Sequence, residues 1–218
     1  MWPPRWLGTK YCLLYSEYRD RPFSFDEAGK VLKIPSERLK VVLGELRREG
    51  FLFSEREGRK TLYFLSGFES IATGIRASEE LRGLSLEDLL RRCWVDYSMA
   101  YLLVGEYAAF YYHGYQLPKE VRVKVFPKDY GFWAQVLGTR SAIPELAEEG
   151  FKERKEVDGI FLEPPERVVL DGIARGSYPR ILDSLAIMVS KARELDWDRL
   201  IGLAVGMNLA SELGALIE

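Results

Sequence analysis

The stretch SERLKVVLGELRREGFLFSEREGRKTLYFL, residues 36–65, decides the fold of the N-terminal part of the chain. Its first half predicts a helix, because apolar residues recur at the three- and four-residue spacing of a helix face. These residues are Leu39, Val42, Leu43 and Leu46. Ser36 is a favourable N-cap, and Gly50 is a favourable stop because glycine adopts a positive φ at low cost. Residues 51–53 and 61–65 then predict two strands, joined by a polar tip at residues 55–60.

The residues before this stretch complete a known order of elements. Residues 9–20 predict a first helix capped by Thr9, and residues 27–32 predict a short second helix capped by Asp26 or Ser24. Helix, short helix, longer helix and hairpin is the order of a winged helix-turn-helix. In such a module the third helix lies in the major groove of DNA, and the hairpin tip contacts phosphate or the minor groove.

The expected DNA contacts come from the third helix and the hairpin. Ser36, Arg38 and Lys40 are expected to face the bases, because they lie away from the apolar stripe near the helix N-terminus. The expected contacts with phosphate or the minor groove are Arg47, Arg48, Arg56, Arg59 and Lys60. The sequence therefore predicts double-stranded DNA as a partner.

Composition is consistent with a DNA-binding module joined to another domain. The 218 residues carry a net charge of −2, but residues 1–66 hold 13 Lys+Arg and 9 Asp+Glu, while the remainder holds 18 and 24. Two isolated cysteines, Cys12 and Cys93, do not form a disulfide framework. The N-terminal residues do not resemble a signal peptide, so we expect a cytoplasmic protein. The sequence holds few Asn, Gln and His residues, and 29% of its residues are charged. This composition is typical of a thermophilic source.

The remainder of the chain predicts a mixed α+β domain. We expect three parts: a winged helix at 1–68, a helical connector at 69–96, and an α+β domain at 97–218. The last part is expected to hold a buried helix within 97–114, entered through a short strand at 101–104, and strands at 121–125 and within 151–162. The expected helices after residue 130 span residues 132–137, 144–149, 166–174, 180–194 and 196–217.

The strand Val121-Arg122-Val123-Lys124-Val125 is the main feature on which the prediction of enzymatic activity depends. Minimal nucleotidyltransferases place two small residues after a strand, and later a strand whose two acidic residues hold Mg²⁺. Here Gly105 is followed by Glu106, and the two acidic positions correspond to Arg122 and Lys124, which cannot ligate a metal ion. We therefore expect a catalytically degenerate domain of this kind, with no cofactor, no metal and no enzymatic activity.

One enzymatic alternative remains open at this point, namely a nucleotidyltransferase with a displaced metal site. It requires Glu106, Asp129, Asp158 and Asp171 to converge. His113 is the single histidine, and a hydrogen-bonded structural role is expected for it. A third alternative is a winged-helix adaptor that binds protein, which would be indicated by a third helix whose outer face is covered.

Four segments together resemble AbiEi-type antitoxins of type IV toxin–antitoxin systems. They are the N-terminal winged helix, VGEYAAFYYHG at residues 104–114, PERVVLD at 165–171 and ASELGALIE at 210–218. The family shows a comparable run ending in His-Gly, a helix start of the form Pro-Glu-Arg/Lys-x-x-Leu-Asp, and a Leu-Gly-x-Leu-Leu-Glu ending. Glu106 departs from the family, where a small residue is commoner.

The resemblance implies a DNA-binding autorepressor fused to a domain that opposes a nucleotidyltransferase-like toxin. The antitoxin domain of the family has itself been likened to a nucleotidyltransferase fold without its active site, in keeping with Arg122 and Lys124. Glu106, Arg122, Lys124 and Asp171 form the candidate partner or ligand site of the back half. A homodimer is a further hypothesis, with the last helix and its Leu203, Val205, Leu209 and Leu213 shared between copies.

Overall fold

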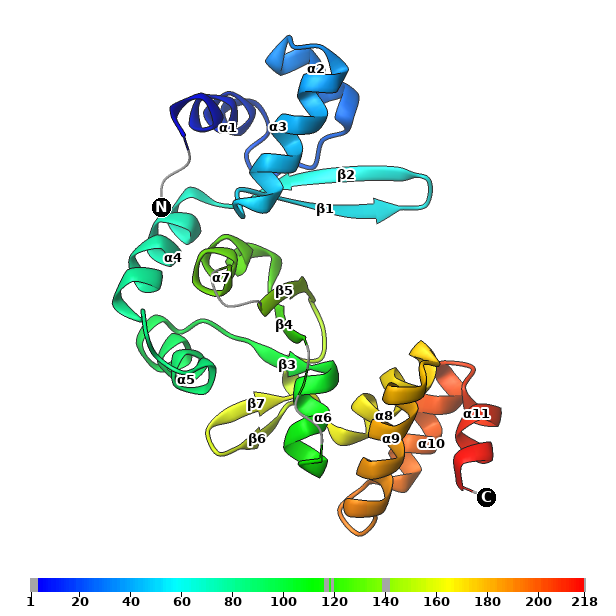
Figure 1. Ribbon diagram of the computed structural model, residues 1–218. Helices are drawn as coiled ribbons and strands as arrows, with labels where there is room; N and C mark the ends of the chain where they lie inside the picture. The colour runs from blue at the N-terminus through cyan, green and yellow to red at the C-terminus, as the bar shows by residue number, and fades with distance from the viewer. Residues whose placement is uncertain (1–3, 116–117, 119, 139–141, 218) are drawn as a thin grey trace. The chain divides into compact units, whose positions relative to one another are not determined.

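The computed structural model describes residues 4–115, 118, 120–138 and 142–217 (Figure 1). It is a mixed α+β structure whose described residues form 11 α-helices and two sheets. Contacts divide the chain into two compact units: Met1–Leu86 with Val125–Arg140, and Glu87–Lys124 with Ser141–Glu218. None of the helices within the described ranges is long and apolar enough to cross a lipid bilayer.

This division differs from the expected boundaries at 68 and 96. The first unit takes in α4 and α7, although α7 follows strand β4 of the other unit in the chain. The elements of the first unit are α1 (Arg5–Tyr18), α2 (Phe25–Leu32), α3 (Ser36–Arg48), β1 (Leu52–Glu57), β2 (Lys60–Leu65), α4 (Phe68–Glu80), the 3₁₀ turn η1 (Pro127–Asp129) and α7 (Tyr130–Leu137).

Helices α1, α2 and α3 pack around one apolar core. The predicted stripe of α3 is buried in it with Leu7, Leu14 and Phe23. Ser36 is the first helical residue and caps nothing, because Pro35 occupies the N-cap position with φ −59° and ψ 149°. The expectation that Ser36 caps α3 is therefore wrong.

The starts of α1 and α2 show the same competition for the cap. Helix α1 begins after Pro4, so Thr9 lies inside the helix and its hydroxyl donates to the carbonyl oxygen of Arg5. The predicted Thr9 cap is wrong. Of the two caps considered for α2, Ser24 is present, in a capping box with Glu27.

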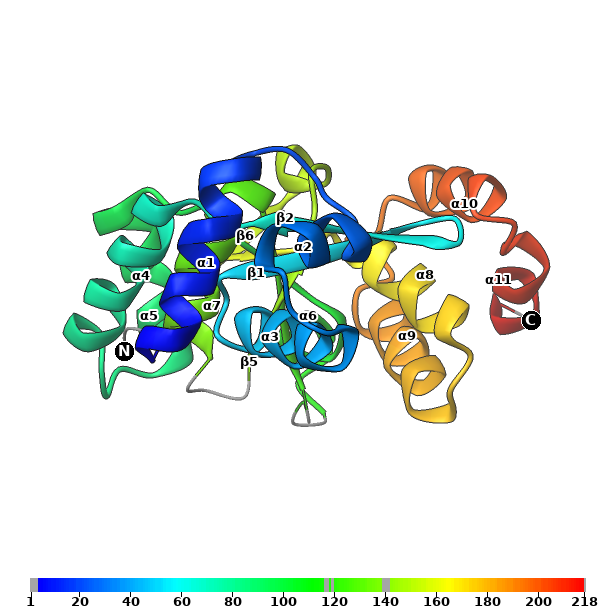
Figure 2. The same cartoon turned by 90° about the horizontal axis from the view of Figure 1, so that it is seen from above.

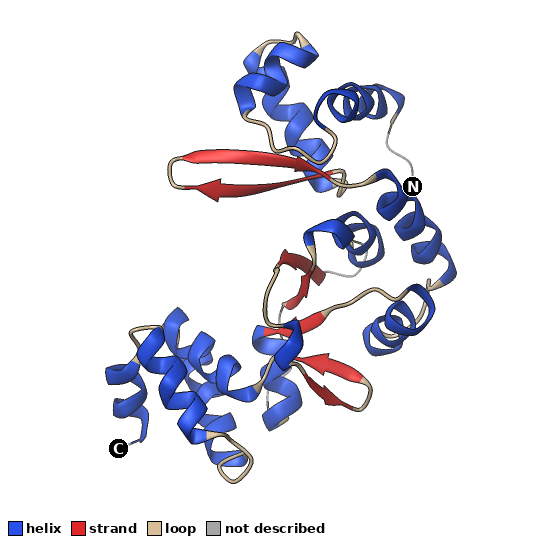
Figure 3. Cartoon of the chain, turned by 180° about the vertical axis from the view of Figure 1, so that it is seen from behind, coloured by secondary structure: helices blue, strands red, loops and turns tan. Residues whose placement is uncertain are grey.

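The hairpin is longer than expected. Strands β1 and β2 pair from Leu52↔Leu65 to Glu57↔Lys60, so most of the predicted tip at residues 55–60 belongs to paired strands. Only two residues remain unpaired at the turn, because backbone hydrogen bonds sustain the ribbon where the side chains are polar. Figure 3 shows the ribbon extending beyond α3. Phe23 adds a bridge to Tyr63, through backbone hydrogen bonds of 3.0 and 2.8 Å.

Helix α7 joins the first unit through close packing on α4. A Cβ on Gly74 would lie 2.7 Å from the backbone of Phe132, so the glycine permits this approach. The Ser70 hydroxyl oxygen accepts the Phe132 N–H at 2.9 Å. Phe132 and Trp133 are fully buried. The mid-chain helix is thus part of the core of the N-terminal unit.

The second unit holds a five-stranded sheet with strand order β5-β4-β3-β7-β6. Its central strand β3 is antiparallel to β4 and parallel to β7, and β6 and β7 form a hairpin. The elements are α5 (Leu86–Tyr97), β3 (Leu102–Val104), α6 (Gly105–His113), β4 (Val121–Val125), β5 (Ala142–Leu146), the 3₁₀ turn η2 (Phe151–Glu153), β6 (Lys155–Val157), β7 (Ile160–Leu162), α8 (Pro165–Arg175), α9 (Tyr178–Ser190), α10 (Trp197–Gly206) and α11 (Ala210–Ile217).

Two elements of the second unit contradict the sequence prediction. Residues 142–146 form the edge strand β5 instead of a helix over 144–149, and an edge position tolerates Pro144, which lacks an N–H. The predicted helix 196–217 is two helices, because Asn208 adopts a left-handed φ of 58° between α10 and α11. Strand β4 and the turn at Gly159 are as predicted.

The C-terminal helices have a core of their own. Helix α6 packs against α8 and α9, and residues of α10 and α11 complete this apolar cluster. Figures 1 and 2 show α8 and α9 side by side, followed by α10 and α11. Helix α6 therefore connects the sheet to the helical end of this unit.

Candidate nucleic-acid interface

The eight residues predicted to contact DNA are all solvent-exposed and all belong to the first unit. Ser36, Arg38, Lys40, Arg47 and Arg48 lie on α3, and Arg56, Arg59 and Lys60 lie on the hairpin. The buried stripe of α3 fixes which side of the helix faces solvent. The structure thus brings these residues onto two neighbouring elements.

The predicted base-facing residues do not share one face of α3. Successive helical residues are rotated by about 100°, so Arg38 and Lys40 lie about 160° apart around the helix axis. They border the exposed face on opposite sides. The centre of that face is formed by Glu37, Val41, Gly44 and Arg48, which we call the outer stripe.

Val41 and Gly44, at the centre of the exposed face, are not among the predicted DNA contacts. The predicted contacts are all polar or charged side chains. The signal was present in the spacing, since positions 37, 41, 44 and 48 follow one line along a helix. Val41 is 59% exposed.

The cations on α3 differ in their ion pairs. Lys40 Nζ lies 3.1 Å from Glu37 Oε1, and Arg48 Nη2 lies 2.5 Å from Glu45 Oε2 and 3.1 Å from Glu49 Oε1. For Arg38, the described residues provide no ion-pair partner. Exposed ion pairs of this kind contribute about 0.2–1 kcal/mol, so a phosphate group can displace these carboxylates from Lys40 and Arg48 at small cost.

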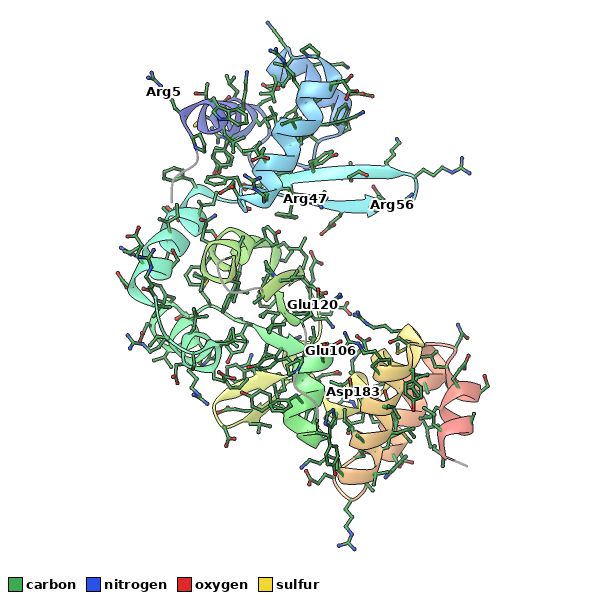
Figure 4. The ribbon with its side chains drawn as sticks, viewed as in Figure 1. Arg5, Arg47, Arg56, Glu106, Glu120 and Asp183 are labelled. Atoms are coloured by element: carbon green, nitrogen blue, oxygen red, sulfur yellow. The ribbon has the colours of Figure 1, made fainter. Side chains whose placement is uncertain are left out.

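Charge is separated between the two faces of the hairpin. Residues paired across an antiparallel ladder share a face, so Ser54, Arg56 and their partners Tyr63 and Thr61 lie on one side. This side faces α3, because Arg47 Nη1 donates to Ser54 Oγ at 3.4 Å. Figure 4 shows Arg47 at the base of the hairpin and Arg56 nearer its turn.

The opposite face of the hairpin carries the carboxylates. Glu55 and Glu57 lie there with their cross-strand partners Leu62 and Lys60. Nearer the base, Phe53 stacks on Phe64 on the same face. Lys60 therefore shares its face with Glu57, whereas Arg56 faces the α3 side without a carboxylate partner among the described residues.

The four residues proposed as a site in the second unit each form an ion pair, and Arg122 forms two. Glu106 pairs with Arg180 at 3.0 Å, and Arg122 pairs with Glu120 at 2.7 Å and Glu145 at 2.8 Å. Lys124 pairs with Glu163 at 2.6 Å, and Asp171 lies 3.7 Å from Arg175. Glu106 and Arg122 are linked through Glu120, whose backbone N–H donates to Glu106 Oε2 at 3.4 Å, and Asp171 lines the same cavity as Arg180, the partner of Glu106.

Glu163 is a charged residue of the core that sequence reasoning missed. Its side chain is 4% exposed, and burial raises the pKa of its carboxyl group, an effect that the Lys124 ammonium group partly offsets. Lys124 and Glu163 lie 39 residues apart in the chain and on different elements. The pairing therefore depends on the sheet, which the local sequence pattern does not predict.

His113 has a defined structural environment. Its side chain is 2% exposed, its Nδ1 accepts the Tyr115 N–H at 3.0 Å, and its Nε2 lies 3.2 Å from Asp183 Oδ1. Burial raises the pKa of the Asp183 carboxyl group, and His113 opposes that effect. Figure 4 labels Asp183 and Glu106, which belong to α9 and α6. This arrangement agrees with the structural role expected for His113.

The second unit provides little room for a nucleotide beside Gly105 and Asp171. A cavity lined by Gly105, Asp171, Arg180 and Asp183 among others measures about 10 Å³, which accommodates about one water molecule. Within the described parts of the chain, no three or more His, Cys, Asp or Glu side chains form a cluster suited to a metal ion. Glu106, Asp158 and Asp171, the members of the displaced site that belong to the second unit, form no such cluster.

Comparison of the chain with protein-family models, curated protein sequences and solved structures gives no significant match. The resemblance to AbiEi-type antitoxins stays a prediction from the quoted segments. The function is accordingly inferred from the residues themselves.

Proposed function

We propose that the chain is a sequence-specific DNA-binding transcriptional regulator that represses its own operon. The observation that carries the proposal is the common direction of the cations on two neighbouring elements. Arg47 of α3 and Arg56 of the hairpin lie on the side where these elements meet, while Glu55 and Glu57 lie on the far face of the hairpin. A polyanion on this side meets Arg47 and Arg56 and avoids Glu55 and Glu57, and Glu37 of α3 is already paired with Lys40.

The order of elements supports a winged helix as the form of this module. Helix α1, the single bridge at Phe23, helices α2 and α3, and the β1–β2 hairpin follow one another as they do in winged helix-turn-helix modules. Helix α3, with 13 residues, is about 20 Å long, and its diameter suits a major groove about 12 Å wide. Each hairpin strand spans about 20 Å, enough to reach the adjacent phosphates.

The proposal is tested by fluorescence anisotropy of the full chain on duplex DNA from upstream of its own gene and on a scrambled duplex. We expect selective binding to the upstream duplex, with affinity falling as salt rises, because each neutralised phosphate releases counterions. Equal affinity for both duplexes at every salt concentration would contradict a sequence-specific regulator.

Single substitutions localise the contacts. Arg56→Ala is expected to weaken binding to all duplexes and to lower the slope of log affinity against log salt by about 1. Lys60→Ala is expected to have a smaller effect, because Glu57 shares its face. Arg76→Ala, which removes an exposed arginine on α4, is the control and should leave the slope unchanged.

We further propose, from the resemblance, that the second unit is a non-enzymatic antitoxin domain opposing a nucleotidyltransferase-like toxin. Cations at Arg122 and Lys124, each already in an ion pair, support the absence of metal-dependent transfer. Co-expression with a nucleotidyltransferase-like protein encoded beside its gene should restore growth that the toxin alone arrests. Mg²⁺-dependent nucleotide transfer by the purified chain would contradict the non-enzymatic part.

A further inference from the structure

The middle of the outer stripe of α3 carries almost no side-chain bulk and no charge. Val41 and Gly44, three residues apart, lie between Glu37 and Arg48 at its two ends. Val41 is 59% exposed and lies at the centre of the exposed face. Both residues face solvent in the unit to which they belong.

Gly44 has no role that the fold of this chain explains. A Cβ at this position would meet nothing within 4 Å, and the residue does not have a positive φ. Glycine in a helix interior is less favourable than any residue except proline. Alanine would therefore fit and would strengthen α3, as it would at Gly202 of α10, so what distinguishes Gly44 is its place at the centre of the exposed face of α3.

The charges around the stripe indicate what approaches it. Lys40 and Arg47 border it on one side, Arg38 and Glu45 border it on the other, and Glu37 is the acidic end of the stripe itself. An apolar strip edged by cations on both sides matches the major groove, where base edges lie between two phosphate backbones.

We propose that Val41 and Gly44 are the specificity-determining residues of α3. Val41 packs against the 5-methyl group of a thymine, and Gly44 lets the helix approach the neighbouring base edge closely. This inference rests on the proposed function. In this arrangement Val41 and Gly44, and not Ser36, Arg38 and Lys40, contact the base edges. Ser36, Arg38 and Lys40 contact the phosphate backbone instead.

The thymine contact is tested by selecting preferred sequences from a random-core duplex library with the full chain, then replacing each selected thymine by deoxyuridine. For the wild type, one replacement should weaken binding about fourfold, the loss expected for one buried methyl group. Val41→Ala should bind the thymine and deoxyuridine duplexes equally, whereas Val41→Thr, which keeps a methyl group, should still distinguish them. No loss at any position, or the same loss in Val41→Ala, would overturn the contact.

The substitution Gly44→Ala distinguishes a role of Gly44 in the approach of α3 to DNA from a role in folding. We expect a melting temperature equal to or above that of the wild type, together with affinity for the selected duplex at least about tenfold lower. Gly202→Ala on α10, where a Cβ would also meet nothing within 4 Å, is the matched control and should leave DNA affinity unchanged. Undiminished affinity of Gly44→Ala, or a lower melting temperature, would overturn the role assigned to this glycine.

The two proposals fail in distinguishable ways. If the wild-type chain enriches no sequence from the library, the proposed regulator function fails. If the wild type enriches a sequence and Val41→Ala and Gly44→Ala bind it like the wild type, the regulator stands and only the assignment of Val41 and Gly44 fails.

Discussion

At the scale of single residues, the pair of Lys124 and Glu163 is the most sensitive point of the second unit. The Glu163 carboxyl group is nearly inaccessible, and its pKa is raised by burial against the opposing effect of Lys124. A buried carboxylate that loses its partner has no compensation for its lost hydration. The stability of the sheet therefore depends on one ammonium group from β4.

Lys124→Met should lower the free energy of unfolding by about 3 kcal/mol at pH 8, the low end for a broken buried pair because Lys124 is itself 28% exposed. The sign follows from Glu163, whose folded-state pKa lies above its unfolded value. Protonation of Glu163 then stabilises the fold at low pH, and this contribution is lost as pH rises through the folded-state pKa. Urea unfolding should thus show the variant approaching the wild type as pH falls from 8 to 5.

The double variant Lys124→Met with Glu163→Gln is the control. Both this double variant and Glu163→Gln alone lack the titrating carboxyl group, so the difference between these two variants should not change over the same pH range. A constant deficit of Lys124→Met from pH 8 to pH 5 would show that lost packing, and not a buried charge, causes the effect. The sequence predicted the alternation of β4, but the identity of this partner depends on long-range pairing.

At the scale of elements, the junction of α3 with β1 depends on helix α7. Gly50 has φ 74°, as the sequence predicted for a helix stop, but a Cβ there would also collide with the Ala134 side chain. Gln135 Nε2 donates to the Glu49 carbonyl oxygen at 2.5 Å, and Tyr130 packs on Phe53. Helix α7 thus supports the base of the hairpin as well as α4.

Comparing Gly50→Ala with Gly58→Ala separates the cost of the positive φ from the cost of disturbing the contact with α7. Both positions have a positive φ, but a Cβ on Gly58 would meet nothing within 4 Å. We expect Gly58→Ala to cost about 1 kcal/mol of unfolding free energy, from the left-handed backbone alone. Gly50→Ala should cost about 3 kcal/mol, because α7 must also shift. Equal losses in chemical denaturation would contradict the packing of α7 on this junction.

Local pattern predicted elements well where one apolar stripe is bounded by a clear stop. Helices α3 and α8 and strand β4 lie close to their expected positions. The errors came from competing local rules: Pro35 took the cap position from Ser36, and Asn208 interrupted a continuous helical pattern. At the candidate site, the sequence identified the cations but not their distribution over faces, which depends on helical phase and hairpin register.

At the scale of the whole molecule, the N-terminal unit is discontinuous in sequence. Its core includes α7, which the chain supplies only after it has formed strands β3 and β4 of the other unit. The apolar residues of α7 are essentially inaccessible to solvent: Phe132, Trp133, Val136 and Leu137. Burial of each contributes about 1.5–3 kcal/mol, a sum comparable with the total stability of a small domain.

A fragment of residues 1–68, the winged helix expected from sequence, should therefore not fold as the full chain does. It lacks both α4 and α7, so the apolar faces that these helices cover would be exposed. We expect a broad thermal transition by circular dichroism and binding of a hydrophobic dye, where the full chain melts cooperatively and binds little. Residues 1–86, which retain α4, should show the same defects to a smaller degree.

Adding a synthetic peptide of residues 125–138 to the 1–86 fragment tests whether α7 is the missing part. The peptide should reduce dye binding and raise the melting temperature, whereas a peptide of the same composition in scrambled order should do neither. A positive result would also mean that the fold of the proposed DNA-binding unit depends on a segment that follows strands β3 and β4 of the other unit in the sequence. A 1–68 fragment that melts cooperatively at the temperature of the full chain would show instead that α4 and α7 are dispensable additions to an independent domain.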